Sequence, residues 1–375
     1  MNYWEYIHVE DLLGLQGGVT DDESSLSNDE VLFVVVHQVY ELWFKLILRE
    51  LTAARDLFDQ APVPDQAMAT AVRSLRRITT IFEQAQQHFR VMETMTTRDY
   101  LGFRDNLLGA SGFQSAQLRE IELLLGLEDS ARISFGGEKT PPADAYKTAL
   151  RGMDGTPSIA LERLERRQKD VAPRDGSPSF PRPRTLKALL DEWIARTPIE
   201  GGADAFLERV IAAHRAECDA RVEIAVERMP HVAKDVVRQR FEAETKFAEA
   251  FLRGEEDETA TPEARAKKRA VRAGLVFLES YREEPRLTWP REVVDATIEM
   301  EQSMIVWRQR HARMVERVIG RRVGTGGSAG VEYLDRTALS YRIFGDLWAV
   351  RTLLLRKDAV PPLEMPSEYR FRVED

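Results

Sequence analysis

The sequence predicts an all-α protein in which one large helical bundle forms a single domain over residues 1–375. Long stretches carry neither Gly nor Pro, and their apolar residues recur at spacings of three and four, which is the period of an amphipathic helix. Hydrophobic residues make up 43% and charged residues 31% of the chain, the balance of a soluble globular protein. A chain of this length can bury a large core.

The clearest helix is expected over residues 26–58. Ser27 and Glu30 match the S-x-x-E capping box that begins helices, and no Gly or Pro follows before Pro62. The run VLFVVV could by itself be a strand, but the unbroken length favours a helix. Apolar residues fall on nearly every side, which is typical of a central, buried helix. These residues are Leu32, Phe33, Val36, Val39, Leu42, Trp43 and Leu46.

Further helices are expected along the rest of the chain, with Pro290 in a first turn and Gly320 as a C-terminal stop. Their approximate ranges are 65–95, 113–127, 157–170, 183–197, 203–253, 261–284 and 290–320. Clustered Gly, Pro and Ser predict loops or lids at 128–156 and a proline-rich connector at 171–184. The charged segment 254–272 is expected to be a solvated helix junction.

Charge and composition argue against several classes of partner. The net charge of −9 disfavours nucleic acid, because phosphate binding needs a basic surface. No run approaches the ~18 apolar residues of a membrane span, so none is expected. The N-terminus lacks the basic and apolar regions of a signal peptide. Cys218 is the single cysteine, so no internal disulfide can form, and we expect a cytoplasmic protein.

The six histidines show no local metal motif. HExxH, HxH and the Cys/His spacings of zinc sites are absent, so a local zinc site is not expected. Any metal would be held by scattered residues or by a prosthetic group. His214 and His231 lie in charged surroundings, which predicts a surface position for both.

Two histidines lie among apolar residues. His37 is in the run VLFVVVHQVYELWFK, and its own segment leaves open whether it is a core residue or a chemical group. His311 belongs to an apolar stripe with Met304, Trp307 and Val318 at helical spacing. It could be a core residue or a neutral imidazole that ligates iron.

Two further elements could bind a polar ligand. Arg104 is four residues from Tyr100 and beside Phe103, so it serves either a structural ion pair or a ligand carboxylate. The residues alone favour the ion pair. The segment GTGGSAG, 324–330, matches G-x-G-x-x-A but follows a helix instead of a strand, which is the wrong context for a dinucleotide site. This segment has two interpretations. It is either a loop that closes over a small polar ligand or a plain linker.

Together these segments resemble the tryptophan 2,3-dioxygenases, a family of haem enzymes that open the indole ring. The motifs occur in the family's order, and residues from about 128 to 265 match poorly, as a helical and loop insertion would. The matching segments are YWEYIHVEDLLGLQ (3–16), NDEVLFVVVHQVYELWFK (28–45), FRDNLLGASGFQSAQLREIELLLG (103–126), SYREEPRL (280–287) and WRQRHARMVERVIGRRVGTGGSAGVEYL (307–334).

The resemblance implies that the bundle encloses a b-type haem whose iron is ferrous in the active state. His311, in the WRxRH motif, matches the proximal ligand of the haem iron. Ser111 and Gly112 match a turn over the haem. Trp307 and Gly324 are expected on the same cofactor-binding surface.

The resemblance also implies a pocket for L-tryptophan and O2. His37 matches the distal histidine that faces the substrate, and Phe33 matches the aromatic wall beside it. Arg104 matches the clamp on the substrate carboxylate. The other expected pocket residues are Tyr100, Phe103, Leu107 and Thr325, and Tyr3, Tyr6 and Ile7 match residues that reach a neighbouring subunit's pocket in the family's homotetramer.

The implied reaction is oxidative cleavage of the indole C2–C3 bond, which gives N-formylkynurenine. A neutral His37 would accept the indole N–H and position the ring. One alternative is a relative that mono-oxygenates, or cleaves a substituted tryptophan, in a biosynthetic pathway. A non-enzymatic haem-binding sensor and a nucleotide-binding protein that uses GTGGSA are further alternatives.

Overall fold

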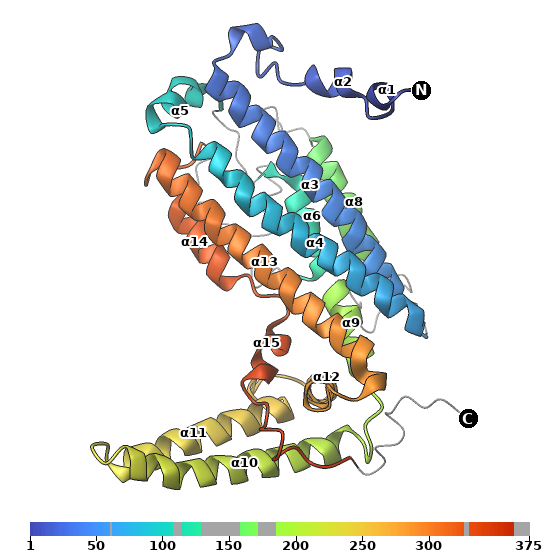
Figure 1. Ribbon diagram of the computed structural model, residues 1–375, viewed down its shortest axis with the longest axis vertical. Coiled ribbons are helices and arrows are strands. Elements are labelled where there is room, and N and C mark those ends of the chain that lie inside the picture. Colours follow the sequence, from blue (N-terminus) through green and yellow to red (C-terminus); the bar gives the residue numbers. More distant parts are fainter. Residues whose placement is uncertain (61, 108–113, 129–157, 172–184, 326–329, 364–375) are drawn as a thin grey trace. The chain divides into compact units, whose positions relative to one another are not determined.

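The computed structural model describes residues 1–60, 62–107, 114–128, 158–171, 185–325 and 330–363, which form helices and connecting turns without a strand (Figure 1). The predicted all-α class is therefore confirmed. In chain order the elements are α1 (Tyr3–Tyr6), α2 (Val9–Leu13), η1 (Glu23–Ser25), α3 (Asn28–Phe58), α4 (Asp65–Met92), α5 (Thr97–Phe103), η2 (Arg104–Leu107), α6 (Ala116–Leu125), α8 (Ile159–Val171), α9 (Leu186–Ile194), α10 (Ala203–Arg228), α11 (Lys234–Arg253), α12 (Pro262–Ser280), η5 (Pro285–Leu287), α13 (Thr288–Ile319), α14 (Val331–Ser340) and α15 (Gly345–Arg351).

The chain divides into two compact units. Unit 1 comprises Met1–Asp56, Arg73–Leu186 and Glu299–Ile343, and unit 2 comprises Leu57–Val72, Lys187–Ile298 and Phe344–Asp375. Several helices begin in one unit and end in the other. The prediction of a single domain stays a prediction.

Three long helices, α3, α4 and α13, lie side by side in unit 1 (Figure 1). The Tyr40 hydroxyl of α3 donates to the Ala85 carbonyl of α4 at 2.9 Å. On the other side of α4, the Gln86 amide donates to the Ser303 carbonyl of α13 at 3.2 Å. These buried polar contacts fix the helices side by side, and large apolar side chains fill the space between them. Leu51, Leu75, Phe82, Phe89 and Trp307 are among those buried.

The start of α3 shows half of the predicted capping box. The Ser27 hydroxyl accepts the backbone N–H of Glu30 at 3.2 Å, which satisfies one of the free donors at the helix start. The Glu30 carboxylate instead accepts from the Asn106 side-chain amide at 3.0 Å. The predicted capping serine is confirmed, and Glu30 ties α3 to η2.

The expectation that α3 is buried on every side is wrong. Val36, Phe44 and Leu51 are buried, but Leu42 and Leu46 are 46% and 44% exposed on another face. Periodicity reports which positions are apolar, whereas burial depends on which faces neighbouring helices cover. The helix is also long and apolar enough to cross a membrane by length and composition alone, contrary to expectation. This is weak evidence, since the core helix of a soluble protein passes the same test.

Unit 2 contains an antiparallel hairpin of α10 and α11 where the sequence predicts one helix over 203–253. The helix ends at Arg228 and restarts at Lys234. Pro230 has no N–H to donate and clashes with the preceding turn, so the helix cannot continue through it. A single continuous helix is therefore a wrong prediction.

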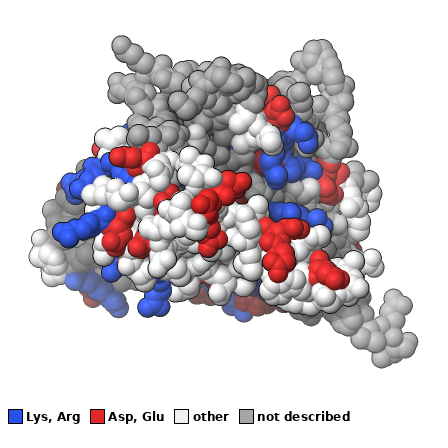
Figure 2. All heavy atoms as spheres, turned by 90° about the horizontal axis from the view of Figure 1, so that it is seen from above, with Lys and Arg blue, Asp and Glu red and all other residues white. Residues whose placement is uncertain are grey.

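The start of α12 differs from the predicted solvated junction. Thr261 caps the helix and Pro262 occupies its first turn. Arg272 is buried, its guanidinium lies 3.7 Å from the centre of the Phe251 ring, and it pairs with Glu256 at 2.6 Å. The charge of Arg272 is balanced inside the structure instead of in water. The face of the molecule shown in Figure 2 carries acidic and basic side chains interspersed.

Candidate active site

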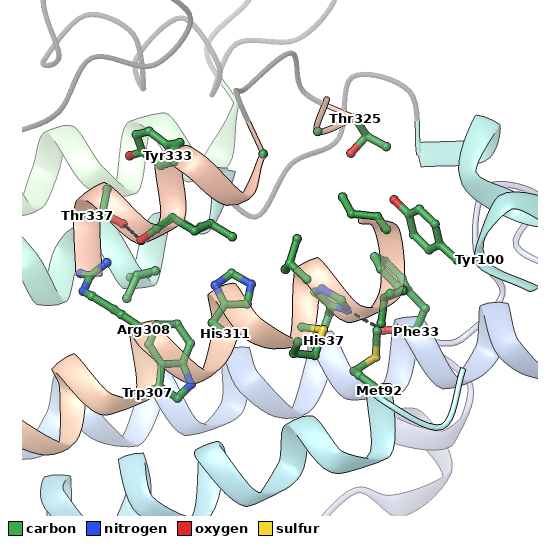
Figure 3. Close-up of a pocket in the computed structure, with 18 of the residues that line it drawn as sticks. Phe33, His37, Met92, Tyr100, Trp307, Arg308, His311, Thr325, Tyr333 and Thr337 are labelled. Atoms are coloured by element: carbon green, nitrogen blue, oxygen red, sulfur yellow. Dashed lines mark hydrogen bonds between the residues drawn. The ribbon is translucent and has the colours of Figure 1, made fainter. Parts of the chain in front are cut away.

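A cavity in unit 1 is lined by seven of the fifteen site residues that the sequence analysis named. It contains about 1170 Å³ of empty space, part of which opens to solvent. Helices α3, α13 and α14 supply most of its walls, and Thr325 lies at one end (Figure 3). In this view the imidazoles of His37 and His311 both point into the open space. Tyr100 and Thr325 lie toward one end and Arg308 and Thr337 toward the other.

His311 projects from α13 between two aromatic rings. Its ring stacks on Phe89 at 5.5 Å between centroids and on Trp307 at 5.6 Å. Burial, together with the nearby His37 and Arg308, lowers the pKa of His311 to about 4. Within the described part of the chain, neither ring nitrogen makes a hydrogen bond. His311 is therefore a neutral imidazole with a lone pair available to a metal.

His37 projects from α3 and has one defined tautomer. Its Nδ1 lies 2.7 Å from the Phe33 carbonyl oxygen. A carbonyl only accepts, so Nδ1 carries the hydrogen and Nε2 keeps its lone pair. The side chain is accessible through the cavity, but protein atoms surround it. This burial lowers the pKa of His37, although the Phe33 carbonyl and the Glu41 carboxylate raise it by smaller amounts. His37 is thus neutral and offers an acceptor.

Arg104 lies at the Thr325 end of the site. Its Nη2 donates to the Val323 carbonyl at 2.7 Å, and its guanidinium also bonds to the Tyr100 hydroxyl. Among the described residues, no carboxylate lies at ion-pair distance from Arg104. The structure therefore does not support the ion pair that the residues alone favoured. It leaves a cation beside a cavity-lining threonine.

The other predicted site residues fall into four groups. Phe33, Tyr100, Trp307, Gly324 and Thr325 line the cavity. Phe103 packs behind it, 5.6 Å from Phe33 and 5.5 Å from Tyr100 between ring centres, while Leu107 is half-buried at the end of η2. Ser111 and Gly112 lie outside the described residues. Tyr3, Tyr6 and Ile7 are exposed at α1, away from the cavity lining.

Sequence reasoning missed a buried ion cluster at the Arg308 end of the cavity. Glu122 is fully buried and pairs with Arg119 at 2.9 Å and Arg308 at 2.6 Å. Both arginines line the cavity. The spacing of Arg119 and Glu122 on one helix face is a signal for the first pair, but the contact with Arg308 spans 186 residues and leaves no local signal.

The residues of α13 that line this cavity include two buried donor atoms with no hydrogen-bond partner in the described part of the chain. They are Nε1 of Trp307 and Nε of Arg308. A buried donor without an acceptor costs free energy. Both belong to side chains that line the cavity.

These features define the class of protein. It is an all-helical protein with a cavity that offers two neutral imidazoles between cationic groups at the two ends of the cavity. Residues 1–354 match the sequence model of the family described as tryptophan 2,3-dioxygenase. The chain belongs to the tryptophan 2,3-dioxygenase family.

Individual relatives agree with this assignment over the full chain. A tryptophan 2,3-dioxygenase of Sorangium cellulosum is 60% identical over 100% of this chain and 88% of its own length. Tryptophan 2,3-dioxygenase 2 of Ralstonia nicotianae is 54% identical over 100% of this chain and 98% of its own. Tryptophan 2,3-dioxygenase B of Danio rerio is 32% identical over 98% and 85% respectively.

The buried ion cluster predicts a large stability effect. Glu122→Gln removes the carboxylate and leaves two buried guanidinium groups, so the free energy of unfolding should fall by about 3–5 kcal/mol. Glu316→Gln is the matched control, because Glu316 forms a 2.6 Å pair with Arg313 that is partly exposed. This control substitution should change the free energy of unfolding by less than about 1 kcal/mol. Urea unfolding followed by circular dichroism measures both. Equal effects would contradict the role of the cluster.

Proposed function

We propose that this chain is a haem-dependent dioxygenase that cleaves the C2–C3 bond of L-tryptophan with O2 to give N-formylkynurenine. One observation carries the proposal. A single cavity brings together the neutral imidazoles of His37 and His311 with the Thr325 segment, to which Arg104 is hydrogen-bonded. The family membership of the whole chain supports the same reaction.

The residues present fit haem b. His311 offers a neutral nitrogen to the iron, and the apolar side chains of Met314, Val318 and Ile319 line the cavity beside it. The guanidinium groups of Arg119 and Arg308, which also line the cavity, supply positive charge that suits the polar, anionic edge of the group. When bound, ferrous haem supplies the site at which O2 reacts. Ser111, Gly112 and Gly324 are assigned to the same surface by the resemblance alone.

The indole ring is bound by an apolar wall and one acceptor. Phe33 lines the cavity with Phe103 behind it, and burying an aromatic ring against such groups is favourable. The indole N–H needs an acceptor inside this wall, and Nε2 of His37 supplies it. His37 positions the ring and need not remove a proton.

The amino-acid end of the substrate is bound at the Arg104 end of the site. Leaving a charged carboxylate unpaired in a buried site is costly. The bond from Arg104 to Val323 uses one of the five guanidinium N–H groups and orients the others. Thr325, two residues further on, lies on the cavity wall and holds the polar end. Such pairing discriminates an amino acid from a bare indole.

The assembly we propose is a cytoplasmic homotetramer that binds neither nucleic acid nor membrane. Exposed apolar residues support an assembly of copies: Tyr3, Trp4 and Tyr6 of α1 are 75%, 47% and 71% exposed, and Leu42 and Leu46 of α3 are also exposed. Apolar groups gathered on one face are a feature of interfaces between subunits. In this arrangement Tyr3, Tyr6 and Ile7 reach a neighbouring copy's pocket.

Product analysis tests the reaction. The protein reconstituted with haem should show a Soret band, and with L-tryptophan and O2 the ferrous form should yield N-formylkynurenine, identified by mass spectrometry. His311→Ala should abolish the band, because it removes the iron ligand. An oxindole-type product, or turnover of substituted tryptophans alone, would establish the mono-oxygenating or biosynthetic alternative. A Soret band without any product would indicate a haem-binding sensor. The absence of a Soret band would exclude all of these haem-based functions.

Arg104→Leu should lower kcat/KM for L-tryptophan by about 30- to 4000-fold, because losing one partner of a buried charge pair costs about 2–5 kcal/mol. Binding of tryptamine, which has no carboxylate, should change little. Arg98→Leu is the control, since Arg98 is exposed on α5, the helix that directly precedes Arg104. Equal losses for both ligands would assign Arg104 a structural role instead.

Charged substitutions on the exposed apolar face of α3, which carries Leu42 and Leu46, are predicted to change the assembly. The double variant Leu42→Glu, Leu46→Glu should give a smaller species than the wild type in light scattering, because it places charges in an apolar interface. Leu339→Glu is the control, since Leu339 is 70% exposed on α14. A wild-type monomer, or an unchanged mass of the double variant, would contradict this use of the face.

A further inference from the structure

The hairpin of α10 and α11 in unit 2 brings together three metal-ligating side chains outside the cavity. His214 and Cys218 lie on α10, and Glu244 lies on α11. Their donor atoms all lie within 4.8 Å of one another. His214 and Cys218 are buried, contrary to the surface position predicted for His214. None of the three takes part in the proposed oxidation.

The positions follow from helix geometry and from the register of the hairpin. Residues four apart on a helix share one face, which places His214 and Cys218 together. Across the hairpin, Arg221 pairs with Glu244 at 3.2 Å and Arg215 pairs with Glu249. This antiparallel register places Glu244 within about one helical turn of the level of Cys218, and its carboxylate reaches the other two donors. The contacts on both sides hold the three side chains on a rigid frame.

The separation of the Cys218 and His214 donor atoms is close to that of two ligands on a tetrahedral zinc ion. With Zn–S near 2.3 Å and Zn–N near 2.0 Å, a tetrahedral angle separates the two donors by about 3.6 Å. Cys218 Sγ and His214 Nδ1 are 3.7 Å apart. A weak S–H···N hydrogen bond would have a similar length, so this distance alone does not decide between the two.

The third donor and the access path favour an ion. Oε1 of Glu244 accepts from Arg221, and within the described part of the chain Oε2 makes no hydrogen bond. A groove along the hairpin, lined by Asp219 and Thr245, reaches Cys218. Burial raises the pKa of the Cys218 thiol, and the positive charge of a metal would offset this by stabilising the thiolate.

We propose that His214, Cys218 and Glu244 bind a zinc-class divalent cation. Nitrogen, sulfur and carboxylate oxygen together suit Zn²⁺ better than the oxygen-seeking Mg²⁺ or Ca²⁺. The three protein ligands leave the fourth tetrahedral position to water. The ion joins α10 to α11 and stabilises the hairpin, because it binds the folded arrangement alone.

Zinc analysis of the purified full-length protein tests this site. After chelation and dialysis against Zn²⁺, we expect one zinc per chain, whatever the haem content. X-ray absorption at the zinc edge should show one sulfur neighbour at about 2.3 Å. Cys218 is the single cysteine of the chain, so a sulfur neighbour identifies it. Zinc coordinated by nitrogen and oxygen alone, or no zinc, would overturn the proposal.

Variants provide the second measurement. Cys218→Ser and His214→Ala should each weaken zinc binding by more than the 10- to 100-fold typical of losing an outer partner, and Glu244→Gln should weaken it less. Zinc should raise the melting temperature of the wild type and leave that of Cys218→Ser unchanged. His231→Ala, exposed in the turn of the same hairpin, is the control and should bind normally. Equal zinc binding by the folded Cys218→Ser variant would contradict the site.

Discussion

The site depends on two imidazoles that stay uncharged inside a protein cavity. Burial lowers the pKa values of both His37 and His311, and the guanidinium of Arg308 adds to the effect at His311. A protonated His311 could not ligate iron, and a protonated His37 could not accept an indole N–H. The aromatic and apolar packing around these residues therefore has a chemical consequence, because it keeps both lone pairs available.

The cationic ends of the cavity require a different form of stabilisation. Glu122 balances charge at one end through its pairs with Arg119 and Arg308. At the other end, Arg104 is held by a backbone carbonyl instead of a carboxylate. The first arrangement supports the helices α6 and α13 that carry it. The second leaves the guanidinium charge for a ligand, which is why we assign substrate binding to the Arg104 end.

Unit 2 shows how the same residue types can serve another purpose. His214 and Cys218 are placed by one helix face, and the turn at Pro230 brings α11 back so that Glu244 completes the group. Without the break at Pro230, the carboxylate would lie far along a single helix. A feature that looked like an interruption of a helix is thus the condition for a three-residue site.

The sequence alone determined the helical class and the main helices, because apolar periodicity and the Ser27 cap are local properties that helix geometry converts into α3, α4 and α13. The short helices α1, α2, α5 and α15 were not predicted, since they contain too few residues for a period and depend on packing. Helix α14 was not predicted either. Motif resemblance singled out His37, Arg104 and His311 together.

Only the tertiary structure decided which faces are covered, which nitrogen of His37 carries the hydrogen, and that Glu122 meets Arg308. It also decided that His214 is buried beside Cys218 and Glu244. Each of these depends on contacts between residues far apart in the chain, and no local pattern records them.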